Sequence, residues 1–305
     1  MELYEQILTE VKKAVFGKDE LLEKILIAIL AKGHILLEDI PGVGKTTIAK
    51  AFATVLGLES RRMQFTVDVL PSDVVGFTVI DPQTRETRLH PGAVFCNIFL
   101  ADEINRTSSR TQAALLEVME ENSITVDGTT YPAYDPFIVI ATQNPFGSAG
   151  TQPLPDSQLE RFLMRLSCGY PEADAEIRIL KSKEIRHETP RQVADAQQVR
   201  NMQAACEEVF IHDDLYAYIV ALVRATRTHA SIRQGASPRA SIALAAAARA
   251  RACLHQRNYV IPEDIQTLFH DIVAHRIQLN AEDTRSDVRA ALLKDILRAV
   301  PAPTL

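Results

Sequence analysis

HILLEDIPGVGKTTIAKAFATVLG, residues 34–57, is the stretch of this chain that decides the fold. It begins with a short apolar strand at residues 34–38 and passes through a glycine-containing turn. A helix follows and closes at Gly57. A strand before the turn and a helix after it are the context that a phosphate-binding loop requires.

The turn carries the residue types that bind the phosphates of a nucleotide. Gly42 and Gly44 allow the backbone to curl so that its N–H groups face a phosphate. The side chain of Lys45 can reach the β- and γ-phosphates, and the Thr46 hydroxyl can ligate Mg²⁺. Asp39 departs from the pattern G-x-x-x-x-G-K-[ST], which has glycine there. We predict that ATP is bound by Pro41, Gly42, Val43, Gly44, Lys45, Thr46 and Thr47.

Strands and helices alternate through the first part of the chain, which predicts an open parallel α/β sheet. Further strands are expected at residues 61–66, 98–102, 137–142 and 164–168. Two insertions are expected to form β-hairpins, one at residues 74–95 and one at 123–134, where Asp127-Gly128 is a strong turn signal.

After Tyr170 the strand signals disappear and helix starts follow one another. Such starts stand at Pro171, His212, Ser237 and Pro262. We therefore predict an α/β nucleotide-binding core at residues 1–170 and a helical domain at 171–305.

Two adjacent acids, Asp102 and Glu103, end the apolar strand at 98–102. The first acid suits Mg²⁺, and the second can orient and activate an attacking water. By itself such a pair is more often a solvated strand end, but together with the phosphate loop it indicates nucleotide hydrolysis. The chain has no NKxD-type guanine signature, which argues against a small GTPase.

Composition argues against several other classes of protein. The net charge is −6, so a strongly basic surface for nucleic acid is not expected. No apolar stretch is long enough for a transmembrane helix, and the charged N-terminus does not read as a secretory signal. The four cysteines lack metal-binding spacing and are expected to be reduced thiols. These features favour a cytoplasmic protein.

Several motifs, in this order, resemble those of the MoxR family of AAA+ ATPases. They are LEDIPGVGKT (37–46), FLADEINR (99–106), TQAALLEVMEE (111–121), VIATQNP (139–145), LPDSQLERF (154–162) and GASPRAS (235–241). The resemblance covers almost the whole chain and implies an AAA+ P-loop NTPase core, with β-hairpin insertions and an all-α lid. An acidic residue at the position of Asp39 is also familiar in that family.

The resemblance implies further site residues. Asn144 matches sensor 1, which holds the attacking water; without the family, a simple turn would be the better reading. Arg161 matches the arginine finger that reaches a neighbouring subunit's nucleotide, and Arg165 is the rival candidate. Arg239 matches sensor 2. A surface salt bridge, or solvation at a helix end, is the alternative for these arginines.

Val15, Phe16 and Gly17 match the stretch that lies beside the adenine in related ATPases. The two hairpins resemble insertions that face the pore or the client of AAA+ rings. Phe77, Val79 and Tyr131 are therefore candidate contact residues, and local packing is an equally good reading.

The family implies a homo-oligomeric ring, expected to be a hexamer, that uses ATP and Mg²⁺. Its work would be chaperone-like maturation, or metal or cofactor loading, of a partner complex, often with a von Willebrand factor A domain protein. A metal-chelatase motor subunit is one alternative. A non-hydrolysing nucleotide-sensing scaffold is another, and the complete hydrolytic set argues against it.

Overall fold

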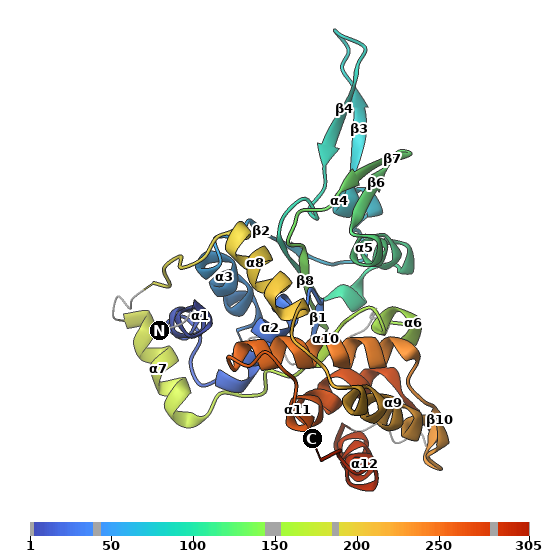
Figure 1. Cartoon of the computed structure of the whole chain (residues 1–305). Coiled ribbons are helices and arrows are strands. Elements are labelled where there is room, and N and C mark those ends of the chain that lie inside the picture. The colour runs from blue at the N-terminus through green and yellow to red at the C-terminus, as the bar shows by residue number, and fades with distance from the viewer. Residues whose placement is uncertain (1–2, 39–43, 144–153, 185–188, 281–285, 305) are drawn as a thin grey trace. The chain divides into compact units, whose positions relative to one another are not determined.

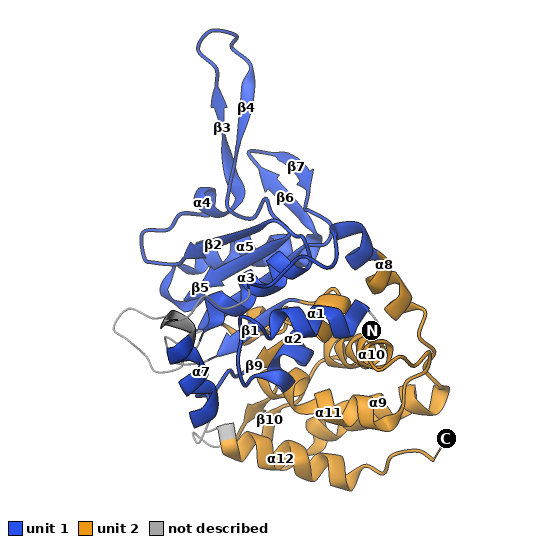
Figure 2. Ribbon diagram, turned by 90° about the vertical axis from the view of Figure 1, so that its left-hand side faces the viewer, with its two compact units in different colours: residues 1–25, 34–154, 166–200 blue, residues 26–33, 155–165, 201–305 orange. Residues whose placement is uncertain are grey.

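The computed structural model describes residues 3–38, 44–143, 154–184, 189–280 and 286–304. The chain forms two compact units, coloured separately in Figure 2. One contains residues 1–25, 34–154 and 166–200, and the other contains 26–33, 155–165 and 201–305. Three of the unit boundaries fall inside helix α2 (Asp19–Leu30), strand β9 (Met164–Leu166) and helix α8 (Ala196–Glu207). The proposed domain division after residue 170 stays a prediction.

A five-stranded sheet organises the first unit. Its strands are β1 (Ile35–Glu38), β2 (Ser60–Gln64), β5 (Ile98–Asp102), β8 (Ile138–Gln143) and β9, in the spatial order β2-β5-β8-β1-β9. The pairs β2/β5, β5/β8 and β1/β8 are parallel, which confirms the predicted parallel sheet. The three central strands are buried along nearly their whole length, as strands covered on both faces should be.

Helices and connecting turns complete the first unit around this sheet. They are α1 (Leu3–Val11), α3 (Lys45–Val55), α4 (Pro71–Val75), the 3-10 turn η1 (Ile104–Arg106), α5 (Ser109–Glu121) and α7 (Ala173–Glu184). Helix α3 buries the apolar face that contains Ile48, Phe52 and Val55. Ser108 caps α5 by accepting a hydrogen bond from the Thr111 N–H.

Both predicted hairpins are present and project from the sheet (Figure 1). The longer one pairs β3 (Gly76–Ile80) with β4 (Thr87–Pro91), and the shorter one pairs β6 (Ser123–Val126) with β7 (Thr129–Pro132). Asp127 and Gly128 form the shorter turn with φ of 47° and 84°. Two positive φ values are what a tight turn between right-twisted strands needs.

Two hydrogen bonds join the two hairpins. The Asp127 carboxylate accepts hydrogen bonds from the Thr78 N–H (2.9 Å) and the Thr78 hydroxyl (2.6 Å). These hydrogen bonds lower the pKa of Asp127. Of the candidate contact residues, Phe77 and Val79 are exposed, whereas Tyr131 is half-buried and packs edge-on against Phe95.

The second unit is mainly helical, which confirms the expected helical lid. Its elements are α6 (Asp156–Leu159), α9 (Asp213–Thr228), β10 (Ile232–Gln234), α10 (Pro238–Leu254), α11 (Pro262–Val273), the 3-10 turn η2 (Ala274–Arg276), β11 (Gln278–Leu279) and α12 (Ser286–Ala299). His212 and Ser237 cap α9 and α10 at the predicted starts. The antiparallel pair β10/β11 is an addition, since strands this short carry no readable alternation.

Among the helices that the structure describes, none is both long and apolar enough to cross a membrane.

A buried carboxylate links two helices of the second unit, α10 and α11. Asp264 is completely buried and binds Arg257 through two hydrogen bonds of 2.6 and 2.7 Å. It also accepts hydrogen bonds from Arg251 and from the Ile261 N–H. Burial alone would raise the pKa of Asp264, but these hydrogen bonds outweigh it, so the pKa lies below its ordinary value.

We expect Asp264→Asn to lower the free energy of unfolding by about 3 kcal/mol or more, because it removes the buried carboxylate charge that pairs with Arg251 and Arg257. The stabilisation by Asp264 should be present above the pKa of an unfolded aspartate. It should be lost as the pH falls through the lower pKa of the folded state. Urea unfolding followed by circular dichroism at several pH values measures both effects.

Asp295→Asn is the matched control. Asp295 is also on a helix of the second unit and pairs with Arg298, but both side chains are exposed. Its replacement should change stability by less than about 0.5 kcal/mol. If the two variants unfolded alike, Asp264 would not stabilise the helical unit.

Candidate functional site

Four parallel strands end at one edge of the sheet. Glu38 at the end of β1 is the register partner of Gln143 at the end of β8. Asp102 at the end of β5 is the partner of Gln64 at the end of β2. In open α/β sheets, ligands bind in the crevice outside the carboxyl ends of the strands. The candidate site therefore lies at this edge.

Helix α3 begins at a glycine in the left-handed conformation. Gly44 is its N-cap with a φ of 92°, and none of the described residues has an atom within 4 Å of a Cβ placed on it. The position therefore needs glycine for its conformation. Lys45 and Thr46 form the first turn and are half-buried, and Thr47 is exposed. The first-turn N–H groups add partial positive charge there.

Pro41, Gly42 and Val43 lie outside the described residues, as do Asp39 and Asn144.

Asp102 is held from two sides at the tip of β5. Its Oδ1 accepts a 2.6 Å hydrogen bond from the Thr142 hydroxyl. Its Oδ2 accepts two hydrogen bonds from Arg62, at 2.7 Å from Nη2 and 3.2 Å from Nε. The Asp102 side chain keeps only 14% of its surface exposed. Its orientation is therefore fixed by its neighbours, which is what a metal-ligating carboxylate requires.

Glu103 follows in a left-handed conformation, with φ 57° and ψ 49°. For a residue with a side chain this conformation costs roughly 1–2 kcal/mol, and such strain gathers at functional sites. The Glu103 N–H donates to the Thr142 hydroxyl at 2.9 Å, and the carboxylate pairs with Arg106 at 2.7 Å. The turn therefore directs consecutive carboxylates to different partners.

Thr142, like Arg62 and Arg106, is a residue at this edge that the sequence analysis does not single out. It is fully buried on β8, and its hydroxyl accepts from the Glu103 backbone while donating to the Asp102 carboxylate. The one sequence feature that could have identified Thr142 is that it is a lone threonine within the apolar run of β8. The Gln143 side chain, next along the strand, donates to Glu38 at 2.7 Å.

Residues 15–18 form a compact turn after α1. Val15 is buried, Phe16 is half-buried, and Gly17 has a left-handed φ of 66°. The Lys18 Nζ donates to all three backbone carbonyls of residues 168–170. This contact fixes the predicted adenine-side stretch within the first unit.

Arg161 belongs to the second unit and follows α6 directly. The buried guanidinium of Arg276 holds the backbone around it, donating to the carbonyl oxygens of Glu160 (3.2 Å), Phe162 (2.7 Å) and Leu163 (3.2 Å). Burial is the main reason why the pKa of Arg276 falls to about 10. Arg276 is another residue that the sequence analysis does not identify.

Arg239 starts α10 and is exposed. Its charge contributes to the lowered pKa of Arg276, so it lies near the segment that carries Arg161. Arg165, the rival finger, is half-buried, and its charge helps burial to keep the pKa of His275 well below its ordinary value. The second unit therefore gathers the predicted arginines, and the choice between Arg161 and Arg165 stays a prediction.

The residues present fit Mg²⁺ rather than a metal held mainly by protein side chains. Across the described ranges, no group of three or more His, Cys, Asp or Glu side chains could hold a metal ion. Thr46 and Asp102 offer a hydroxyl and a carboxylate. Mg²⁺ takes such a small set of oxygen ligands when substrate phosphates and water supply the rest.

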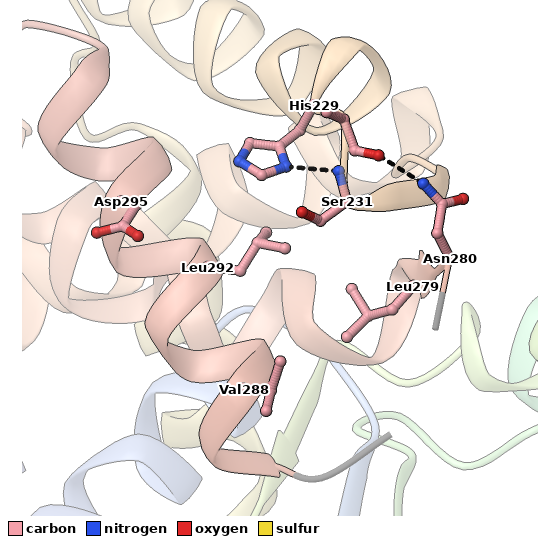
Figure 3. A pocket seen from close by; sticks show the side chains of 8 residues that line it. His229, Ser231, Leu279, Asn280, Val288, Leu292 and Asp295 are labelled. Carbon is pink, nitrogen blue, oxygen red and sulfur yellow. Dashed lines mark hydrogen bonds between the residues drawn. The ribbon is translucent and has the colours of Figure 1, made fainter. Parts of the chain in front are cut away.

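A separate cavity of about 560 Å³ lies in the second unit (Figure 3). Leu279, Val288 and Leu292 give it an apolar side, and Ser231 and Asn280 give it polar groups. It contains none of the predicted site residues.

Comparison with known proteins agrees with this arrangement. The family described as "ATPase family associated with various cellular activities (AAA)" matches residues 34–164, and the AAA lid domain matches residues 224–296. The crystal structure of a candidate ATPase from Cytophaga hutchinsonii superposes with a TM-score of 0.90 at 35% identity, covering 99% of this chain and 96% of that one. The predicted α/β core with a helical lid is therefore confirmed.

Three relatives match along nearly the whole chain. The uncharacterized protein YeaC of Bacillus subtilis is 46% identical, covering 96% of this chain and 92% of the relative. Chaperone MoxR1 of Mycobacterium tuberculosis is 36% identical, covering 98% of this chain and 82% of the relative. Protein MoxR of Methylorubrum extorquens is 32% identical, covering 96% of this chain and 93% of the relative. On these matches, together with the fold and the residues at the sheet edge, the chain belongs to the MoxR family of AAA+ ATPases.

Proposed function

We propose that this protein hydrolyses Mg²⁺–ATP at the carboxyl edge of its parallel sheet, as one subunit of a ring. The observation that carries the proposal is the pair of oriented acids, Asp102 and Glu103, at the end of β5. The left-handed Gly44 that begins α3 supports it. Phosphoryl transfer depends on positioning and charge stabilisation, and this edge supplies groups for both.

Each group has a distinct role in the proposed reaction. Lys45 and the first amides of α3 bind the phosphates, and Thr46 and Asp102 hold Mg²⁺, which neutralises phosphate charge when bound. The Glu103 carboxylate orients the attacking water and accepts its proton. Arg106, 2.7 Å from that carboxylate, holds its orientation. Asn144 completes the placement of the water.

We further propose that the arginines act between subunits. Arg161, supplied by a neighbour, would stabilise the charge of the transition state, and Arg239 would couple the lid to the phosphates. Arg276 supports this role because it anchors the backbone on both sides of Arg161. A site completed by a neighbour makes hydrolysis depend on assembly, for which we propose a hexameric ring.

The biological output that we propose is chaperone-like remodelling of a partner complex, either its maturation or its loading with metal or cofactor. The name of the relative Chaperone MoxR1 supports this direction. A protein with a von Willebrand factor A domain is the proposed partner. Phe77 and Val79, exposed on the long hairpin, would contact the client. The proposed location is the cytoplasm.

Gly44→Ala should weaken nucleotide binding about tenfold, because alanine disfavours the left-handed φ by roughly 1–2 kcal/mol and the loop would relax away from the phosphates. None of the described residues has an atom within 4 Å of a Cβ at Gly44, so the expected cause of the loss is the backbone conformation. Titration with a fluorescent ATP analogue gives the dissociation constant.

Gly128→Ala is the control for that change. Gly128 also has a left-handed φ, of 84°, and equally open surroundings, but it lies in a hairpin turn. It should lose similar stability and keep full nucleotide affinity. Equal affinity of the two variants would argue against a phosphate site at Gly44.

Glu103→Gln should reduce ATP turnover by about 10²-fold or more and keep nucleotide affinity within a factor of about two, since only the proton acceptor is lost. Steady-state phosphate release and nucleotide titration separate these effects. Glu117→Gln, the same chemical change at an exposed position on α5, should behave as the wild type. Full turnover by Glu103→Gln would refute the assigned role.

Arg161→Ala should lower turnover by about 10³-fold without weakening nucleotide binding, whereas Arg165→Ala should remain active. The specific activity of the wild type should rise with protein concentration. Mixing the inactive Arg161→Ala and Glu103→Gln proteins should restore activity. In random rings about a quarter of the interfaces would then join an intact Glu103 to an intact Arg161.

Absence of recovery in that mixture, together with activity independent of concentration, would show that Arg161 does not act in trans. Recovery with Arg165→Ala in place of Arg161→Ala, when Arg165→Ala alone is inactive, would reassign the finger to Arg165.

A further inference from the structure

Arg62 binds the carboxylate of Asp102, which is the proposed ligand of Mg²⁺. Its Nη2 and Nε both donate to Asp102 Oδ2, at 2.7 and 3.2 Å. The same Nη2 lies 3.2 Å from the Gln64 Oε1. Because the Thr142 hydroxyl occupies Oδ1, both oxygens of Asp102 already have a strong partner within the protein.

Strand register explains why Arg62 reaches Asp102. Gln64 is the direct partner of Asp102 across β2 and β5, and Arg62 is the partner of Leu100. Residues two apart on a strand share a face, so Arg62 lies diagonally across from Asp102 on the same side of the sheet. The long arginine side chain spans that diagonal.

Exposure makes this ion pair breakable. The Arg62 side chain is 45% exposed, so it can turn into solvent at small cost, whereas Asp102 is mostly covered and stays in place. A cation beside the carboxylate also reduces the electrostatic attraction that a second cation would feel there.

We propose that Arg62 is a positioning residue that competes with Mg²⁺ for the Asp102 carboxylate. Arg62 and Thr142 together orient the carboxylate, and Mg²⁺ binding displaces the arginine fork from Oδ2. Arg62 therefore sets the Mg²⁺ concentration at which the site fills. This inference rests on the proposed function, because it takes Asp102 as a metal ligand.

The neighbouring Arg61 makes a closely similar pair that serves as an internal reference. Its Nε and Nη2 donate to one oxygen of Glu59, at 3.2 and 3.1 Å, and its side chain is 39% exposed. Arg61 is on the same strand but its side chain points to the other face, away from Asp102. Replacing either arginine by methionine removes one charge and one ion pair from β2.

The test measures nucleotide binding rather than turnover. In a Glu103→Gln background, the anisotropy of a fluorescent ATP analogue is followed as Mg²⁺ is added to full-length protein. Arg62→Met should lower the half-saturating Mg²⁺ concentration about tenfold, because the competing charge is removed. Arg61→Met should leave it within about twofold, and Arg62→Lys, which keeps the charge, should stay near the parent.

The other outcomes are distinguishable. If Arg62→Met left the Mg²⁺ requirement unchanged, or raised it, competition would be refuted while the proposed function stood. If Arg61→Met lowered the requirement equally, the effect would be one of general charge, and the role of Arg62 would again be refuted. If the parent showed no Mg²⁺-dependent binding at all, the proposed function would fail and the inference with it.

Discussion

Parallel pairing of β1, β8 and β5 is the constraint on which the rest of this structure depends. Parallel strands that start on one side of a sheet must finish on the other, so their carboxyl ends share an edge. Glu38, Asp102 and Gln143 all stand at that edge. Because the strands are buried, their register is fixed, and the polar groups at their tips are held to a common geometry.

Within that edge, a buried hydroxyl and two arginines decide how the acids point. Thr142 bridges the Asp102 carboxylate and the backbone of Glu103, while Arg62 and Arg106 each hold one acid. Charge-assisted hydrogen bonds of this kind fix orientation before any substrate arrives. The left-handed backbone at Glu103 is part of the same arrangement, since it turns two consecutive acids toward different partners.

The helical unit achieves comparable rigidity with buried charges. Arg276 donates hydrogen bonds to three backbone carbonyls close to Arg161, and the buried Asp264 carboxylate binds two arginines. These hydrogen bonds offset part of the cost of burying the two charges, and they hold the backbone segments that accept or donate them. Under the proposed function, Arg161 stands on such a segment and would be presented to a neighbouring subunit already ordered.

Sequence alone determined the parallel sheet, both hairpins, the helix starts and the family, because each depends on consecutive residues: hydrophobic period, turn chemistry and motif order. The Asp127-Gly128 turn and the Ser237 cap are examples. Tertiary structure alone decided the partners of the acids. Thr142 and Arg62 each lie 40 residues from Asp102 along the chain. Only the strand order and register bring such distant side chains together, and no local pattern in the sequence encodes that pairing.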